Sequence, residues 1–223
     1  MNPGAARLLR GLGIGTAVVA WAVVAHLGSA GTGDPDLAVA VALAPLAAVA
    51  IVLLWRVHRP LLLVAGCAAG AGLAATLWPA LRHNVALLYY LQHLGTNLAL
   101  AALFGRTLLA GREALVSQFA RLAHGGAISP LKRRYTRRVT VAWTAFFVVN
   151  AAVSTGLFLW APAAVWSTYA NLLTMPLLVA MFAVEHAVRV RVLPPAERSS
   201  VADTVRGYRA AMRARARPVA GQP

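Results

Sequence analysis

Hydrophobic residues in this chain form long, nearly uninterrupted blocks that are separated by short polar, glycine- or proline-containing connections. A helix that crosses the hydrocarbon core of a bilayer needs about 20 mostly apolar residues. Six blocks approach or exceed this length, at residues 11–27, 37–57, 61–81, 85–109, 139–160 and 164–188. The pattern predicts an all-α, polytopic bundle of six transmembrane helices, with a membrane domain over residues 1–192 and a basic tail over residues 193–223.

Composition supports a membrane setting. The 223 residues are 60% hydrophobic and only 12% charged, whereas a soluble domain is about one quarter charged. The polar surface is too small to cover a water-soluble globule of this size. Cys67 is the only cysteine, which excludes an intramolecular disulfide and a cysteine-based metal cage.

The distribution of charge orients the chain. There are 21 Lys and Arg residues against 6 Asp and Glu, and short cytoplasmic loops are the ones that retain Lys and Arg. Arg82 is the one basic residue in the loops on the opposite side of a six-span drawing, where Asp34 and Asp36 lie. We therefore expect both termini in the cytoplasm. The preference for Arg over Lys is typical of a GC-rich bacterial genome.

The first block also fits a secretory signal peptide. Residues 1–30 combine a basic start, an apolar stretch and the small residues Gly28, Ser29 and Ala30. The apolar run is long enough to span, which favours a retained helix. Cleavage would leave five spans and place the mature N-terminus outside.

Two segments outside the spans have amphipathic patterns. Residues 111–124 predict a short helix on the inner surface, because Leu115, Phe119 and Leu122 share one face. The tail carries a second apolar stripe flanked by Arg residues. The residues expected to dock a partner are Lys132, Arg133, Arg134, Arg206, Arg209 and Arg213.

Two interpretations of this basic surface stay open. It docks anionic lipid headgroups or an acidic protein such as an acyl carrier protein, or it serves only as a retention signal that keeps these loops inside. Nucleic-acid binding is not expected, because topology explains the charge and no binding motif accompanies it.

Polar residues inside the predicted spans are candidates for function, because burying polarity in lipid is costly. They are Gln92, His93, Asn97, Asn150 and Asn171. One hypothesis is a polar pocket or proton relay between the fourth, fifth and sixth spans. The other is hydrogen bonding that joins helices, worth roughly 0.6 kcal/mol per contact.

Glu185 is the only acidic residue within a predicted span. Arg189 follows four residues later, on the same helix face. This spacing favours an ion pair near the cytoplasmic end over an isolated functional carboxylate.

Motifs for several chemistries are missing. The sequence has no HExxH, GxSxG or Walker motif. Aspartate occurs only at positions 34, 36 and 203, so a metal held by clustered aspartates within the membrane is not expected. We predict no metal site and no cofactor.

The second half of the chain resembles a known family. The resemblance rests on NLALAALFGRTLL at residues 97–109, RRYTRRVTVAWTAFFVVN at residues 133–150 and WSTYANLLTMPLLVAMFAVEHAVR at residues 166–189. These blocks resemble polytopic inner-membrane proteins encoded in bacterial aryl-polyene (xanthomonadin-type) pigment clusters. The family has no settled biochemical activity, and the resemblance covers about residues 84–192.

The resemblance implies a role beside polyketide-like chain assembly, lipid attachment or export. The motif positions it marks are Tyr135, Thr136, Arg137, Arg138, Thr140, Trp143, Asn150, Tyr169, Asn171 and Glu185. Where the family pattern has an aromatic residue after the glutamate, this chain has His186.

The leading functional hypothesis is a non-enzymatic accessory protein of the inner membrane that supports aryl-polyene or acyl-lipid biosynthesis or export. One alternative is an acyl or glycolipid transferase with His93 as general base, since that role needs a group that titrates near the working pH. A second alternative is a small transporter or transporter subunit.

Overall fold

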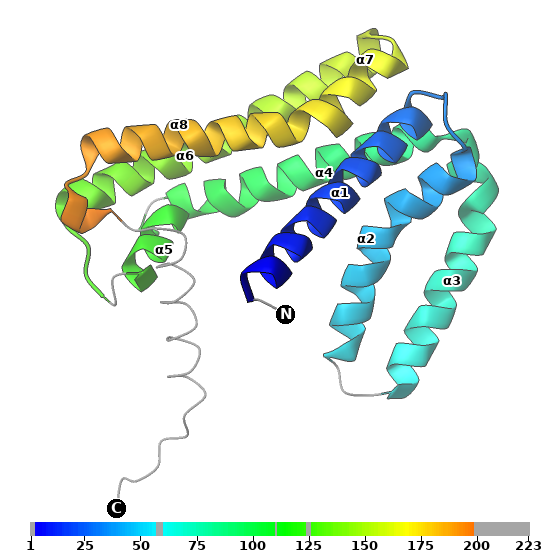
Figure 1. The fold of residues 1–223 in the computed structure, drawn as a ribbon, viewed down its shortest axis with the longest axis horizontal. Coiled ribbons are helices and arrows are strands. Elements are labelled where there is room, and N and C mark those ends of the chain that lie inside the picture. Colours follow the sequence, from blue (N-terminus) through cyan, green and yellow to red (C-terminus); the bar gives the residue numbers. More distant parts are fainter. Residues whose placement is uncertain (1–2, 57–59, 110, 124–125, 199–223) are drawn as a thin grey trace, which may run out of the picture. The chain divides into compact units, whose positions relative to one another are not determined.

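The protein is all-helical. A computed structural model describes residues 3–56, 60–109, 111–123 and 126–198, and these residues contain no strand (Figure 1). Its elements are α1 (Pro3–Ser29), α2 (Pro35–Trp55), α3 (Pro60–His83), α4 (Val85–Gly105), η1 (Arg106–Leu108), α5 (Leu115–Ala123), α6 (Pro130–Trp160), α7 (Ala163–Ser167), the π-helical segment η2 (Thr168–Leu173), α8 (Thr174–Val192) and η3 (Pro195–Glu197).

Five helical stretches of the described chain are long and apolar enough to cross a membrane. They are Leu8–Ser29, Pro35–Trp55, Leu61–His83, Pro130–Trp160 and Ala163–Val192. These stretches correspond to five of the six predicted spans, as in a multi-pass membrane protein. The remaining predicted span, the fourth at residues 85–109, contains α4, a 21-residue helix that carries Gln92, His93, Thr96 and Asn97 and is not one of the five.

The chain divides into two compact units. Unit 1 comprises Met1–Gly95 and Ala152–Leu177, and unit 2 comprises Thr96–Ala151 and Leu178–Pro223. The divisions fall inside α4, α6 and α8. This two-unit division was not predicted, because a span-by-span reading of hydropathy treats each helix as a single element.

In unit 1, α1 packs on α2, α2 packs on α3, and α1 also contacts α7 and η2. Gly28 permits the close approach of α1 to α2, since a Cβ built there would overlap the Cβ of Ala38. Asp34 starts α2 by accepting hydrogen bonds from the backbone amides of Asp36 and Leu37. Trp166 is completely buried in the core of this unit.

In unit 2, α6 supplies most of the core. Tyr135, Val139, Trp143 and Phe147 follow one another at four-residue spacing, and all are buried. The Trp143 ring lies 4.7 Å from that of Phe182 on α8, measured between centroids. The buried face of α6 therefore joins α4 and α8 through aromatic contacts.

The short helix predicted within residues 111–124 is present as α5. Its small residues Ser117 and Ala120 are buried, as is Ala114 just before it. Its placement on a membrane surface stays a prediction. The tail helix predicted around Arg206, Arg209 and Arg213 lies outside the described residues.

Candidate functional site

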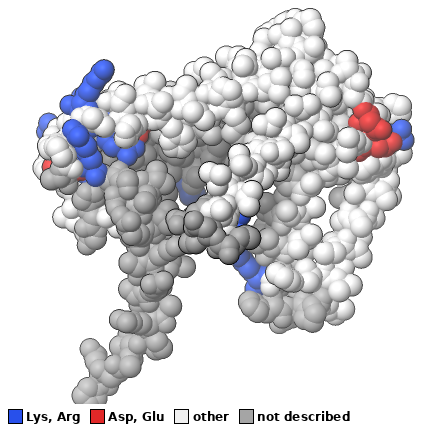
Figure 2. Space-filling model, in the orientation of Figure 1, with Lys and Arg blue, Asp and Glu red and all other residues white. Residues whose placement is uncertain are grey.

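Basic side chains gather at the start of α6 (Figure 2). Pro130 occupies the first position of the helix, which suits its fixed φ and missing amide hydrogen. Arg133, Arg134, Arg137 and Arg138 follow, and all four are exposed.

Lys132 differs from these arginines because it is only 2% exposed. Its Nζ donates a hydrogen bond of 2.6 Å to the backbone carbonyl of Glu197. Ser129 also donates to the Glu197 carboxylate, at 2.7 Å. The predicted docking residue Lys132 thus ties α6 to the segment after α8, and its ammonium group is not presented at the surface.

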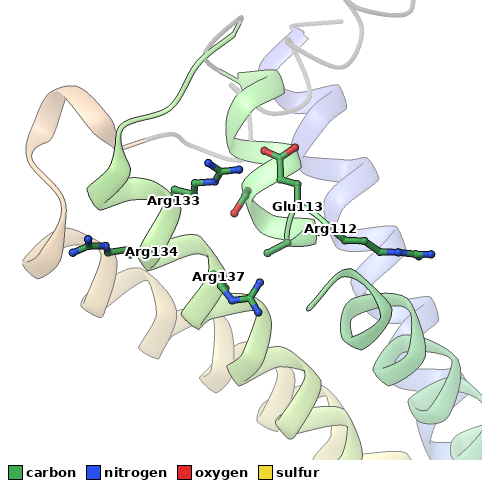
Figure 3. Close-up of a pocket in the computed structure, with 7 residues that line it drawn as sticks. Arg112, Glu113, Arg133, Arg134 and Arg137 are labelled. Carbon is green, nitrogen blue, oxygen red and sulfur yellow. The ribbon is translucent and has the colours of Figure 1, made fainter. Parts of the chain in front are cut away.

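A shallow cavity of about 200 Å³ opens beside these arginines. It is lined by Arg112, Glu113 and Ala114 just before α5, by Ser117 of α5, and by Arg133, Arg134 and Arg137 of α6. Figure 3 shows Arg133 and Arg137 extending from α6 towards the segment that leads into α5, whereas Arg134 and Arg112 point away to opposite sides. Glu113 is the one acid in the lining and pairs with Arg121 at 2.8 Å.

Hydroxyl groups fix α5 against α6 at this cavity. The hydroxyls of Ser117 and Thr136 lie 2.6 Å apart in a buried hydrogen bond. Thr140 Oγ1 accepts from the backbone amide of Val116 at 3.3 Å. This bond satisfies a donor that the first turn of a helix leaves unpaired.

The connection before α5 is held in the same way. Thr107 Oγ1 accepts from the backbone amide of Leu115 at 2.9 Å. Arg137 donates to the backbone carbonyl of Leu108 at 3.0 Å. Of the motif residues, Arg137 therefore lines the cavity, while Thr136 and Thr140 hold α5 beside it.

Glu185 forms the predicted ion pair with Arg189, and it has a further partner. Arg189 donates to both carboxylate oxygens, through Nε at 3.0 Å and through the adjacent guanidinium nitrogen. Tyr135 donates to Glu185 Oε1 at 2.8 Å. Since Glu185 is 9% exposed, this buried carboxylate links α6 to α8.

Polar residues of α4 contact three other elements. Tyr89 and Gln92 each donate 2.9 Å hydrogen bonds to carbonyls of α2, those of Ala38 and Ala42. His93 Nε2 lies 3.1 Å from the hydroxyl of Thr174. The His93 ring also meets that of Tyr169 edge-on, with centroids 6.2 Å apart.

The five predicted intramembrane polar residues are divided between the two units. Gln92, His93 and Asn171 belong to unit 1, whereas Asn97 and Asn150 are buried in unit 2. Asn150 donates to the backbone carbonyl of Phe146 at 2.8 Å. The bonds of Tyr89, Gln92 and His93 run to other elements, whereas this bond of Asn150 stays within α6.

A buried polar network in unit 1 was missed by the sequence analysis. Ser167 is completely buried, and its Oγ lies 2.8 Å from both His26 Nδ1 and Ser29 Oγ. Asn171 donates to Ser29 at 2.9 Å and to Ser167 at 3.2 Å. More than 130 residues separate the two halves of the network in sequence, so no local spacing could have revealed it.

The serine–histidine pair in this network has the short separation of a nucleophile and its base. Ser167 Oγ also donates to the His26 carbonyl at 2.9 Å, and no part of Ser167 is exposed. These hydrogen bonds therefore join α1 to α7 and η2. Within the described chain, no group of three His, Cys, Asp or Glu side chains is placed to hold a metal ion.

Comparisons with known family models, curated proteins and solved structures find no match to this chain.

Proposed function

We propose that this protein is a six-span accessory protein of the bacterial inner membrane, and that its basic cytoplasmic face docks an acidic biosynthetic partner. The setting suggested by the sequence resemblance is aryl-polyene or acyl-lipid assembly or export. The observation that carries the proposal is the group of exposed arginines at the start of α6. The hydrogen bond between Ser117 and Thr136 holds this part of α6 beside α5, and the bond from Arg137 to the Leu108 carbonyl holds it beside the connection before α5.

The six-span topology requires α4 to cross the bilayer. At about 1.5 Å per residue, its 21 residues reach across a hydrocarbon core of about 30 Å. Tyr89 and Gln92, which reduce its apolar character, bond to carbonyls of α2. A polar helix is tolerated in lipid when its polar side chains are satisfied by neighbouring helices.

Arg82 is the single basic residue in the loops on the outer side of this topology, and its ion pair makes that position compatible with the orientation. Arg82 pairs with Asp36 at 2.9 Å, and Trp78 donates to the same carboxylate oxygen at 2.7 Å. Because an acid neutralises Arg82, its presence outside conflicts little with the tendency of cations to remain in the cytoplasm.

An acidic carrier protein is the partner chemistry that suits the face. Opposite charges across an interface raise the association rate and select the partner, and these effects do not require a large apolar patch. An acyl carrier protein supplies both negative surface charge and an acyl chain, and spans α4, α6 and α8 would shelter part of that chain.

The proposal is tested by reversing the charge of the arginines at the start of α6. Arg133→Glu, Arg134→Glu, Arg137→Glu and Arg138→Glu are combined in a strain that makes the pigment, and pigment is compared with membrane-inserted protein. We expect pigment to fall sharply while insertion is preserved. Arg191→Glu reverses the charge of an exposed arginine on α8, outside this group, and serves as the control. Normal pigment together with normal insertion of the α6 variant would rule out docking at this face.

A further inference from the structure

Helix α5 has two opposite faces. With about 3.6 residues per turn, Ser117 and Ala120 lie on one side, which Ala114 continues just before the helix, and Leu115, Phe119 and Leu122 lie on the other. The first side is buried against the protein. Phe119, on the second side, is 43% exposed.

This arrangement determines the depth of α5 in a membrane. An amphipathic helix in the interface buries its apolar face about 5–10 Å into the boundary between headgroups and acyl chains. The helix is about 10 Å across, so its opposite side lies at the level of the phosphates. That side is the one that lines the cavity with Ala114 and Ser117.

The cavity at this level is positively charged. Arg133 and Arg137 extend towards it from α6 (Figure 3). The one acid in its lining, Glu113, is neutralised by Arg121. Guanidinium groups bind phosphate oxygens in a bidentate manner, and the neighbouring hydroxyl of Ser117 is held in place by Thr136.

We infer that this cavity binds the phosphate headgroup of one anionic phospholipid of the inner leaflet, with Arg133 and Arg137 as the phosphate-binding residues and α5 embedded beside it through its Phe119 face. The inference deepens the proposed function and rests on its membrane orientation. It does not require the acidic protein partner. The lipid would hold α5 and the start of α6 at the depth where docking takes place.

The test measures lipid retained by the purified full-length chain. Protein in detergent is mixed with equal amounts of phosphatidylglycerol and phosphatidylcholine, and bound lipid is identified by native mass spectrometry. We expect one phosphatidylglycerol to be retained in preference to phosphatidylcholine. Because each Arg near an anionic surface contributes about 1 kcal/mol, the Arg133→Gln, Arg137→Gln pair should weaken retention roughly twenty-five-fold.

Two controls separate the cavity from general charge. The Arg138→Gln, Arg191→Gln pair removes the same charge from exposed positions on α6 and α8 and should retain the lipid. Arg133→Gln alone leaves the bond from Arg137 to Leu108 intact and should cost about fivefold, which keeps the test valid if the double variant fails to fold.

Several results would overturn the inference. The first is that the unmodified chain shows no preference for phosphatidylglycerol. The second is that the two double variants lose equal amounts of bound lipid. The third is that equimolar inorganic phosphate displaces the lipid. The last result would identify a free phosphate as the ligand. Lipid loss with normal pigment would support the lipid site while contradicting a role for these two arginines in partner docking.

Discussion

The carboxylate of Glu185 shows how a single residue can decide helix packing in this chain. It is buried, and it accepts hydrogen bonds from Tyr135 on α6 and from Arg189 on its own helix. Removing one partner from a buried ion pair leaves charge uncompensated, so the members of such a group depend on one another. Glu185 therefore holds α8 against α6 and needs no substrate to explain its burial.

Replacing Tyr135 by Phe tests this role. The variant loses the hydroxyl donor with little change in shape, and we expect the free energy of unfolding in detergent to fall by about 1 kcal/mol. Combining it with Glu185→Gln should give less than the sum of the two separate losses, because Tyr135→Phe removes the hydrogen bond that Glu185→Gln weakens. Strictly additive losses would mean that Tyr135 and Glu185 are not coupled.

His93 provides a residue-scale test of the transferase alternative. Its Nε2 lies beside the Thr174 hydroxyl, which is the arrangement of a group that joins helices. We expect His93→Gln to leave pigment level and protein abundance close to normal, since Gln retains a hydrogen-bonding side chain. Complete loss of product at normal abundance would instead support a general base.

At the scale of elements, hydropathy predicts the apolar helices well and their partners poorly. The blocks at residues 37–57 and 139–160 correspond to α2 and the C-terminal part of α6, because a long run of apolar residues has few alternatives to a membrane helix. The predicted pair of Glu185 and Arg189 is confirmed, since both residues lie on one helix at fixed spacing.

Contacts between distant segments lay beyond the sequence analysis. Lys132 was expected at the docking surface with its neighbours, yet Glu197 from the segment after α8 buries it. Ser29 and Ser167 likewise meet only through the packing of α1 on α7 and η2. Hydropathy and residue spacing describe each helix by itself, so they cannot predict contacts between residues that are far apart in the sequence.

Helix α5 allows a direct test of membrane contact. In a Cys67→Ala background, a spin label at Phe119→Cys should be accessible to oxygen dissolved in lipid and protected from a water-soluble relaxation agent. A label at Ala127→Cys, which is exposed in the connection before α6, should show the reverse. Equal accessibility of both sites to the water-soluble agent would show that α5 does not lie on the membrane.

For the whole molecule, the account depends on α4 crossing the bilayer. If it does, the acid-paired Arg82 and the arginines at the start of α6 face opposite compartments. If α4 stays on one side, both groups face the same compartment, and the cytoplasmic docking face loses its basis. The polar side chains that α4 directs to α2 make the crossing physically acceptable.

The measurement that tests this most directly is cysteine accessibility in intact cells. Asn84→Cys and Ala127→Cys flank α4 and lie at exposed positions, and each is introduced separately into the Cys67→Ala chain. With a maleimide that cannot cross the inner membrane, we expect Asn84→Cys to react in intact cells and Ala127→Cys to react only after that membrane is permeabilised. Labelling of both sites in intact cells, or of Ala127→Cys alone, would contradict the proposed topology and the functions that rest on it.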